Sequence, residues 1–491
     1  MSTLPPIFLA EREISEDDWA QTPDSVRRAF DWLWQERERL REQAGQSSRN
    51  SSVPPSKERP QHKKPRRARC TTRPPGGQPG HPGVTRPLVP PEQVTTTLLV
   101  TPTRCPGCGH LFPDDAPTTG NPYRHQVFEL PPILPTVTEY QLAHCACPDC
   151  GRTVRAPRPA GVPALTLGPR AQALVTLLTG QYHLAKRQVA TCLRDVCGLP
   201  LSAASVCAIE AAVSAALAAP VAAVRTAVAQ APAKNVDESG WPQRREPDAG
   251  QPADTPLKRG WLWSITTPDA SVYRIRRSRG QGVARELLGG RPPTTALTGV
   301  VVTDRYSAYN WLPLAYRQLC WAHLDRDFLA ISERADPTAQ RIGQGLMSQA
   351  DTLFHAWRRY REGALTFPEL GAMLQPVRAE VAALLRAGHE SDPKTKTVCH
   401  LLLQLEPALW TFLRVEGVEP TNNAAERSQR RGVMKRDRTF GTQSSAGSRY
   451  VERVLTTVAT CQLQRRNVLD YLTEALRAHL HGTPAPSLIP P

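Results

Sequence analysis

The 491-residue sequence has no apolar run that approaches the roughly 18 residues needed for a membrane-spanning helix. Its first residues, MSTLPPIFLAEREISEDDW, contain no basic segment leading into an apolar one, which is the pattern of a secretory signal. Both absences argue against a membrane protein and predict a soluble protein of the cytoplasm. A chain of this length is too long for one hydrophobic core and predicts two to four domains.

The sequence is also short of acidic residues. Lys and Arg number 61 against 45 Asp and Glu, which gives a formal net charge of +16 and an isoelectric point near 9.6. Such an excess favours a polyanionic partner, with nucleic acid first and an anionic membrane surface second.

Much of the positive charge lies in residues 49–99, a segment rich in Ser, Pro and Gly with almost nothing to bury. This composition predicts a disordered or loosely held linker. Between Lys57 and Arg73 only Glu58 is acidic. We favour phosphate contact over a solvated tail for this run, and its central basic residues are candidate DNA-binding residues: Lys63, Lys64, Arg66, Arg67 and Arg69.

The twelve cysteines are scattered, and four of them form two close pairs; because we see no export signal, this pattern favours metal binding over a disulfide framework. The pairs are CPGC and CPDC, each followed by a glycine that permits a tight turn around a metal ion. Four thiolates in two such pairs suit tetrahedral zinc. We therefore predict a zinc module over residues 100–158 with these ligands: Cys105, Cys108, Cys147 and Cys150.

Two alternatives stay open for this module. Cys145 could replace Cys147 as a ligand, although it breaks the spacing of the pair, and a redox dithiol would explain the doubled motif poorly. The segment between the pairs, residues 124–145, predicts the strands of an intervening hairpin.

Helical patterns occupy residues 25–43 within the N-terminal segment 1–48, and most of residues 159–230. The second region contains two helical patterns joined by a turn with a glycine, and Ser202 is placed to cap the second helix. This pair is either a helix-turn-helix DNA reader or a helical support for the next domain, and the sequence does not choose between them.

From residue 234 the pattern changes to strands, which predicts an α/β domain. Three β-rich runs and a helical stretch precede a short buried strand, Gly299 to Val302, and this order would place Asp237 and Asp304 on neighbouring central strands. Aspartates in apolar surroundings are costly unless they are paired, hydrogen-bonded or bound to a cation. A shared metal site is one explanation, and the capping of a following turn is the other.

A third acidic residue stands in the stretch EPTNNAAERSQRRGVMKRDRTF, residues 419–440. Asn423 precedes Glu426 by three residues, so the two could form a helix-capping arrangement. Capping does not explain the basic residues that follow at helical spacing, whereas a metal-binding carboxylate at the start of a phosphate-contacting helix explains both. The candidate DNA-binding residues here are Arg430, Arg431 and Lys435.

The stretches VDESGW, VVTDRYSAYN, CWAHLDRDF and NNAAERSQR resemble the motifs of bacterial transposases of the insertion sequence 66 family. The resemblance extends over most of the chain, including the linker and the cysteine pairs. It implies a ribonuclease-H-like mixed sheet, formed by residues 231–334 and 415–480, with a helical insertion at 335–414. It also implies a catalytic triad of two aspartates and a glutamate, which by match are Asp237, Asp304 and Glu426.

Carboxylate ligands of this kind suit Mg²⁺ or Mn²⁺. Two such ions can activate water or a DNA 3′-hydroxyl and stabilise the leaving oxygen. Arg427 could meet a phosphate, and the resemblance suggests a structural or catalytic role for Cys320 and His323. For that pair, a buried cysteine and a satisfied histidine are an equally good interpretation.

The expected function is that of a DNA transposase that binds the terminal inverted repeats of its element, cleaves there and joins the ends to double-stranded target DNA. Such an enzyme would act in the bacterial cytoplasm at the nucleoid, as a homo-oligomer on DNA, with or without companion proteins of the same element. The alternatives are a zinc-containing DNA-binding protein or inactive relic that binds ends without cutting, and a nuclease without strand transfer.

Overall fold

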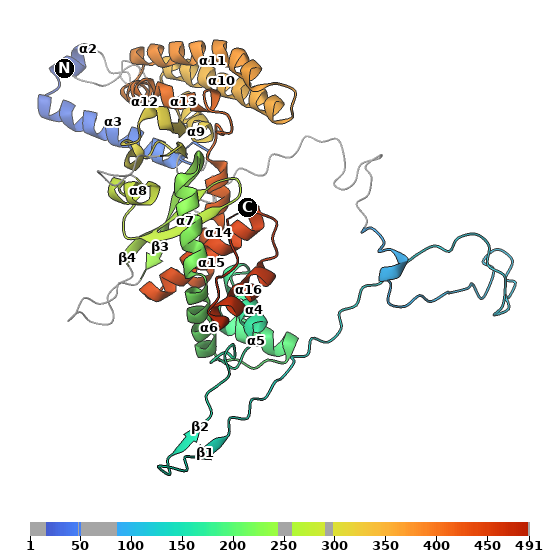
Figure 1. Cartoon of the computed structure of the whole chain (residues 1–491). Coiled ribbons are helices and arrows are strands. Elements are labelled where there is room, and N and C mark those ends of the chain that lie inside the picture. Colours follow the sequence, from blue (N-terminus) through green and yellow to red (C-terminus); the bar gives the residue numbers. More distant parts are fainter. Residues whose placement is uncertain (1–15, 48, 51–85, 244–257, 290–297, 490–491) are drawn as a thin grey trace. The chain divides into compact units, whose positions relative to one another are not determined.

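The computed structural model describes residues 16–47, 49–50, 86–243, 258–289 and 298–489 (Figure 1). The chain divides into two compact units, one formed by residues 1–62 with 135–491 and the other by residues 63–134. The linker residues predicted to bind DNA, namely Lys63, Lys64, Arg66, Arg67 and Arg69, lie outside the described residues.

A five-stranded mixed sheet forms the centre of the larger unit, with the strand order β5-β4-β3-β6-β7. β3 pairs antiparallel with β4, and β4 pairs antiparallel with β5. β3 also pairs parallel with β6, and β6 with β7. The predicted α/β class is confirmed, with these strands: β3 (Ala233–Gln243), β4 (Lys258–Thr266), β5 (Ser271–Arg276), β6 (Val300–Thr303) and β7 (Arg317–Leu319).

The short strand β6 is buried on both faces, because alternate side chains enter two different hydrophobic cores. Val301 belongs to the first core, and Val300 and Val302 belong to the second. The first core is built largely from helices that precede the sheet in the sequence and from two helices near the C-terminus. The former are α4 (Pro169–Gly180), α5 (Lys186–Cys197), α6 (Ala203–Ala216) and α7 (Ala218–Gln230), and the latter are α15 (Ser445–Leu463) and α16 (Val468–His481).

The second core is formed mainly by helices between β7 and residue 413, so the helical stretch predicted there is present. In Figure 1, α10 and α11 lie side by side, and they pack against each other. The helices between β7 and residue 413 are α9 (Trp321–Ser332), α10 (Pro337–Arg361), α11 (Phe367–Ala387), α12 (Pro393–Gln404) and α13 (Glu406–Leu409), and α14 (Asn423–Thr439) follows them. The earlier helix α8 (Gln281–Leu288) precedes β6 and packs in the first core.

The pair α5 and α6 has the predicted local structure. Gly198 ends α5 in the left-handed conformation at φ 61°, and the Ser202 hydroxyl accepts the backbone N–H of Ser205 at the start of α6. Their apolar residues enter the first core, and α6 packs on α15 and α16. The pair therefore packs against the domain that follows, as the predicted helical support would.

No single helix in the described part of the chain is long and apolar enough to cross a membrane, and only α6 and α7 taken together, across a 51° bend, reach that length and composition.

The remaining elements are short or lie near the N-terminus. The predicted N-terminal helix is present as α3, and its apolar residues Phe30, Leu33 and Leu40 are exposed. These elements are α2 (Glu16–Gln21), α3 (Asp24–Gly45), β1 (His144–Ala146), β2 (Thr153–Arg155) and the 3₁₀ turns η3 (Pro91–Gln93), η4 (Ser307–Tyr309), η5 (Leu314–Tyr316), η6 (Gly388–Glu390) and η7 (Thr411–Leu413).

The hairpin predicted between the two cysteine pairs is wrong. Residues 124–143 form no strand, and the only regular pairing nearby is the hairpin of β1 and β2, which surrounds the second cysteine pair. The alternating apolar residues that suggested strands are largely exposed: Val127 by 80%, Leu130 by 85% and Val137 by 85%. Without a surface on which to bury this face, the alternation gives no sheet.

Candidate active site

The parallel pair β3 and β6 aligns the two aspartates. Asn235 is the register partner of Val302, and Asp237 and Asp304 each lie two residues further along the chain. In parallel strands such positions share one face and one edge of the sheet. Oδ1 of Asp237 accepts the backbone N–H of Glu238 at 2.9 Å, and Oδ1 of Asp304 accepts that of Tyr306 at 2.9 Å.

The start of α14 is fastened to β3, and this places Glu426 beside the aspartates. The Asn422 side-chain amide donates to the Val236 carbonyl at 2.7 Å. Gln429, which is buried, donates to the carbonyls of Leu262 at 2.7 Å and Asp237 at 3.3 Å. These bonds satisfy backbone groups on two strands, so they hold the helix in one position over the sheet.

A glycine allows α14 to approach the sheet closely. A Cβ atom on Gly432 would lie 2.1 Å from Cδ2 of Leu262 on β4, so with any side chain here either the buried Leu262 side chain or the helix would have to shift. Because Glu426 lies less than two turns earlier on the same helix, the position of its carboxylate depends on this contact.

Glu426 does not form the helix-capping arrangement with Asn423 that the sequence allows. The N-cap of α14 is Asn422, and no side chain accepts a backbone N–H at this helix start. Among the described residues, Oε1 of Glu426 is buried without a hydrogen-bond partner.

Asp304 and Glu426 lie near enough to Asp237 to act on its charge, and none of the three carboxylates has a Lys or Arg ion-pair partner among the described residues. Burial, and then the charges of Glu238, Asp304 and Glu426, raise the pKa of Asp237 well above its usual range. Each like charge makes ionisation of the aspartate harder, and a bound cation would remove this penalty.

Glu238 is a further acidic residue of this cluster, and it is not among the residues predicted from the sequence. Its carboxylate receives the Arg279 guanidinium at 2.9 Å and the Tyr309 hydroxyl at 2.6 Å. Arg279 in turn stacks on Tyr306 and Trp261, with its guanidinium carbon 3.7 Å and 4.7 Å from the ring centroids. Glu238 therefore has an ion-pair partner within the protein, unlike the other three acids. Its position next to Asp237 was the only sequence signal.

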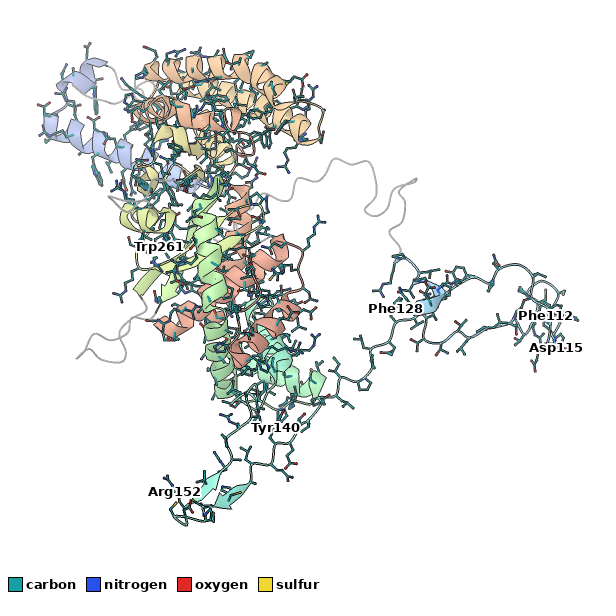
Figure 2. All side chains as sticks on the ribbon, in the orientation of Figure 1. Phe112, Asp115, Phe128, Tyr140, Arg152 and Trp261 are labelled. Carbon is teal, nitrogen blue, oxygen red and sulfur yellow. The ribbon has the colours of Figure 1, made fainter. Side chains whose placement is uncertain are left out.

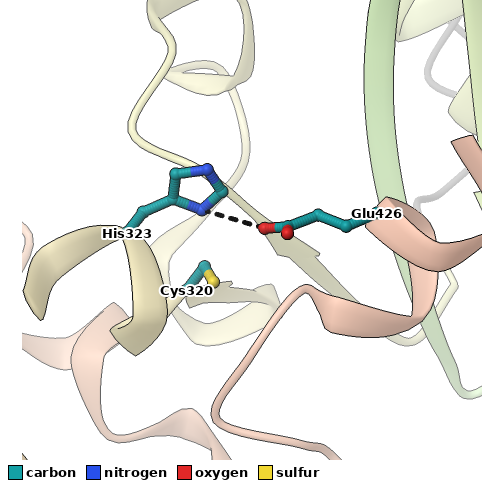
Figure 3. Close-up of side chains that lie close together, drawn as sticks. All are labelled: Cys320, His323 and Glu426. Atoms are coloured by element: carbon teal, nitrogen blue, oxygen red, sulfur yellow. Dashed lines mark ion pairs between the residues drawn. The ribbon is translucent and has the colours of Figure 1, made fainter. Parts of the chain in front are cut away.

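Cys320 and His323 lie at the beginning of α9, next to Glu426 (Figure 3). Nδ1 of His323 is 3.6 Å from Oε1 of Glu426, and the ligand atoms of all three residues lie within 4.8 Å of one another. Cys320 is buried and its Sγ accepts the backbone N–H of Asn422 at 3.1 Å. Burial raises the pKa of this thiol to about 11. Asp237 and Asp304 are not part of this closest group.

Comparison with known proteins identifies the family. The model of the family described as "Transposase IS66 family" matches residues 165–450, more than half of the chain, and this span contains every residue of the site described so far. The chain belongs to the IS66 transposase family. Residues 25–87 match a second model, described as "Family of unknown function (DUF6444)".

A curated relative was also found, "Uncharacterized protein y4qI" of Sinorhizobium fredii (strain NBRC 101917 / NGR234). It is 26% identical over 262 residues, which cover 48% of this chain and 46% of the relative. The match therefore spans less than half the length of that protein.

The basic residues of α14 in this IS66-family chain have different environments. Arg427 and Arg430 are exposed. Arg427 and Arg431 line a cavity of about 320 Å³, together with Asn235, which is two residues before Asp237 on the same face of β3. Lys435 does not fit the prediction of a DNA-contacting residue: it is buried, and its Nζ donates to the Thr179 carbonyl at 2.7 Å. Burial lowers the pKa of Lys435 to about 8.

The two cysteine pairs form the same local turn. The Cys105 N–H donates to the His110 carbonyl at 2.8 Å, and the Cys147 N–H donates to the Arg152 carbonyl at 2.9 Å. Arg152, labelled in Figure 2, lies in the hairpin of β1 and β2 that surrounds the second pair. Backbone N–H groups, that of Cys108 first, lower the pKa of Cys105, and those of Cys150 and Asp149 do the same for Cys147. N–H groups that point at a sulfur stabilise the thiolate form that binds metals.

Proposed function

We propose that this chain is a metal-dependent DNA transposase whose catalytic residues are Asp237, Asp304 and Glu426. The observation that carries the proposal is the electrostatic effect of Asp304 and Glu426 on Asp237: the three carboxylates, on β3, just after β6 and on α14, have no Lys or Arg ion pair among the described residues. Carboxylates arranged in this way are the ligands that Mg²⁺ and Mn²⁺ prefer.

The topology supports a ribonuclease-H-like assignment. Three antiparallel strands in sequence are followed by two strands that are added on the other side of the first, parallel to it. A helix after the insertion then returns to the first strand with the third acid. This arrangement is what the resemblance to insertion sequence 66 transposases implies.

The residues fit a pair of divalent cations, because burial and then its acidic neighbours raise the pKa of Asp237, and Oε1 of Glu426 has no hydrogen-bond partner within the described ranges. Asp237 would hold both ions, and Asp304 and Glu426 one each. Bound there, the ions supply the activation of a water or a 3′-hydroxyl and the stabilisation of the leaving oxygen.

The protein's own groups complete the proposed mechanism. Gln429, Asn422 and Gly432 hold Glu426 against the sheet, and a displacement of about 1 Å in such a site can cost on the order of a hundredfold in rate. Arg427 and Arg431 are placed to bind DNA phosphates near the carboxylates, and the exposed Arg430 extends this surface. The linker arginines and lysines add affinity that does not depend on sequence.

We further propose that the cysteine pairs bind zinc. Their matching turns and the lowered pKa values of Cys105 and Cys147 support metal-binding thiolates in each pair. If one zinc ion is bound by both cysteine pairs, elemental analysis should find one zinc ion per chain.

A strand-transfer assay tests the function. The DNA that flanks the gene supplies the terminal repeats, and a labelled duplex with such an end and a free 3′-hydroxyl is incubated with the purified protein, Mg²⁺ or Mn²⁺, and plasmid. Joining of the label to plasmid is the expected result. Cutting alone would assign a nuclease, and bound DNA without either reaction would assign a DNA-binding protein or an inactive relic.

A further inference from the structure

Two buried polar atoms face each other beside the proposed catalytic centre. Nδ1 of His323 and Oε1 of Glu426 are 3.6 Å apart, which is too long for a hydrogen bond (Figure 3). Neither atom has a hydrogen-bond partner in the part of the chain that is described. A buried polar group without a partner is costly, so a pair of them facing each other needs an explanation.

A shared cation explains the separation. Imidazole nitrogen and carboxylate oxygen bind ions such as Zn²⁺ at about 2.0 to 2.2 Å, and two ligands at a tetrahedral angle on one ion are then roughly 3.4 Å apart. The observed separation of 3.6 Å is close to this value. One ion between the two atoms would satisfy both of them at once.

The fold holds the histidine in this place. Cys320 is the residue that precedes α9, and its Sγ accepts the N–H of Asn422, the residue that precedes α14. The N–H of Trp321 donates to the Pro420 carbonyl at 2.9 Å. These two bonds join the starts of the helices that carry His323 and Glu426. Cys320 is therefore a positioning residue, because its sulfur is engaged in this connection.

We propose that His323 is a nitrogen ligand of the cation that Glu426 holds, so that this position of the centre takes a transition-metal ion in preference to Mg²⁺. The inference rests on the proposed function. Its chemical reason is that Mg²⁺ selects oxygen ligands, whereas imidazole suits transition metals. Mn²⁺ is a useful probe, because it accepts both kinds of ligand and is paramagnetic.

The test is pulsed electron paramagnetic resonance of the full chain loaded with Mn²⁺. A bound imidazole gives a ¹⁴N hyperfine coupling, which changes to that of ¹⁵N when the protein is made with ¹⁵N-labelled histidine. The wild-type chain is expected to show this coupling. His323→Ala and His323→Gln are expected to lose it and to bind Mn²⁺ at least about tenfold more weakly at one position, with a smaller change for Mg²⁺. His355→Ala, at an exposed histidine of α10, is the matched control and is expected to change neither result.

The outcomes separate this inference from the proposed function. If Mn²⁺ binding depends on Asp237, as shown by Asp237→Asn, but the wild-type chain has no histidine coupling, His323 forms an ion pair with Glu426 and the inference is wrong while the function stands. If Mn²⁺ binding does not depend on Asp237 at all, the carboxylate centre and the inference fail together.

Discussion

Removing the charge of Asp237 is expected to stabilise the metal-free protein while it removes catalysis. The pKa of this carboxyl is raised in the folded state by burial and by the neighbouring acids. Between the ordinary pKa of an aspartate and the raised value, the folded protein binds more protons than the unfolded chain. Its stability therefore falls as pH rises through this range, and the full penalty applies above the raised pKa. Asp237→Asn has no such penalty, and an amide oxygen can still accept the Glu238 N–H.

The size of the effect follows from two relations. Each unit by which the pKa is raised costs about 1.4 kcal/mol of stability at pH values above it. A cation that binds only the folded centre at a concentration of 100 times its Kd stabilises the wild-type chain by about 2.7 kcal/mol. Because 1 kcal/mol shifts the melting temperature by roughly 2 to 4 °C for domains of 150 to 250 residues, shifts of a few degrees are expected in both cases.

Differential scanning calorimetry in chelator, from about pH 5 to pH 8, measures the first effect. The variant should melt above the wild type, with a gap that grows with pH, and adding Mn²⁺ should raise the melting temperature of the wild type more than that of the variant. Asp437→Asn, at an exposed residue of α14 paired with Arg436, is the matched control and should show neither effect. A variant that melts below the wild type at every pH would show that Asp237 makes favourable contacts and does not face a charge cluster.

Three further results are expected. Gln429→Ala removes the side-chain donor to the carbonyls of Leu262 and Asp237, so urea unfolding should show a loss of about 1 to 3 kcal/mol, and an unchanged midpoint would show that α14 is held by other contacts. Purified protein should contain about one zinc ion per chain, reduced in Cys105→Ser, and less than about half an equivalent in the parent would reject the site. Deleting residues 57–73 should lower the salt dependence of DNA binding by several units while specific and random DNA stay discriminated, and an equal slope would make the run a solvated tail.

The sheet of this protein could be predicted in large part, because β4 and β5 are β-rich runs separated by a turn and because β6 is a short apolar run buried on both faces. The sequence placed Asp237 and Asp304 on neighbouring strands, and the register of β3 and β6 confirms that placement. The hairpin strands predicted within residues 124–145 are absent from residues 124–143, because the same alternation has no partner surface there. The alternation of apolar residues in the sequence does not by itself distinguish a segment that joins a sheet from one that stays exposed.

Contacts between distant segments could not be predicted from the sequence. Lys435 continues the helical spacing of Arg427 and Arg431, but its partner is the carbonyl of Thr179 on α4, which no local pattern indicates. The ion pair of Glu238 with Arg279 and its hydrogen bond from Tyr309 likewise depend on two separate later segments. Charge spacing along one helix describes a face, and only the packing decides whether that face meets solvent or protein.

The central claim is that Glu426 is a catalytic metal ligand, and the most direct measurement is strand transfer by Glu426→Gln. Glutamine is a poor ligand for Mg²⁺ but has nearly the same shape, so the variant should fold, bind labelled DNA ends as the parent does, and lose cleavage and joining by a factor on the order of a thousand or more. Glu474→Gln, at an exposed residue of α16, should keep the parental rate. If Glu426→Gln joins DNA ends at anything near that rate, Glu426 is not a catalytic ligand and the assignment of the triad is wrong.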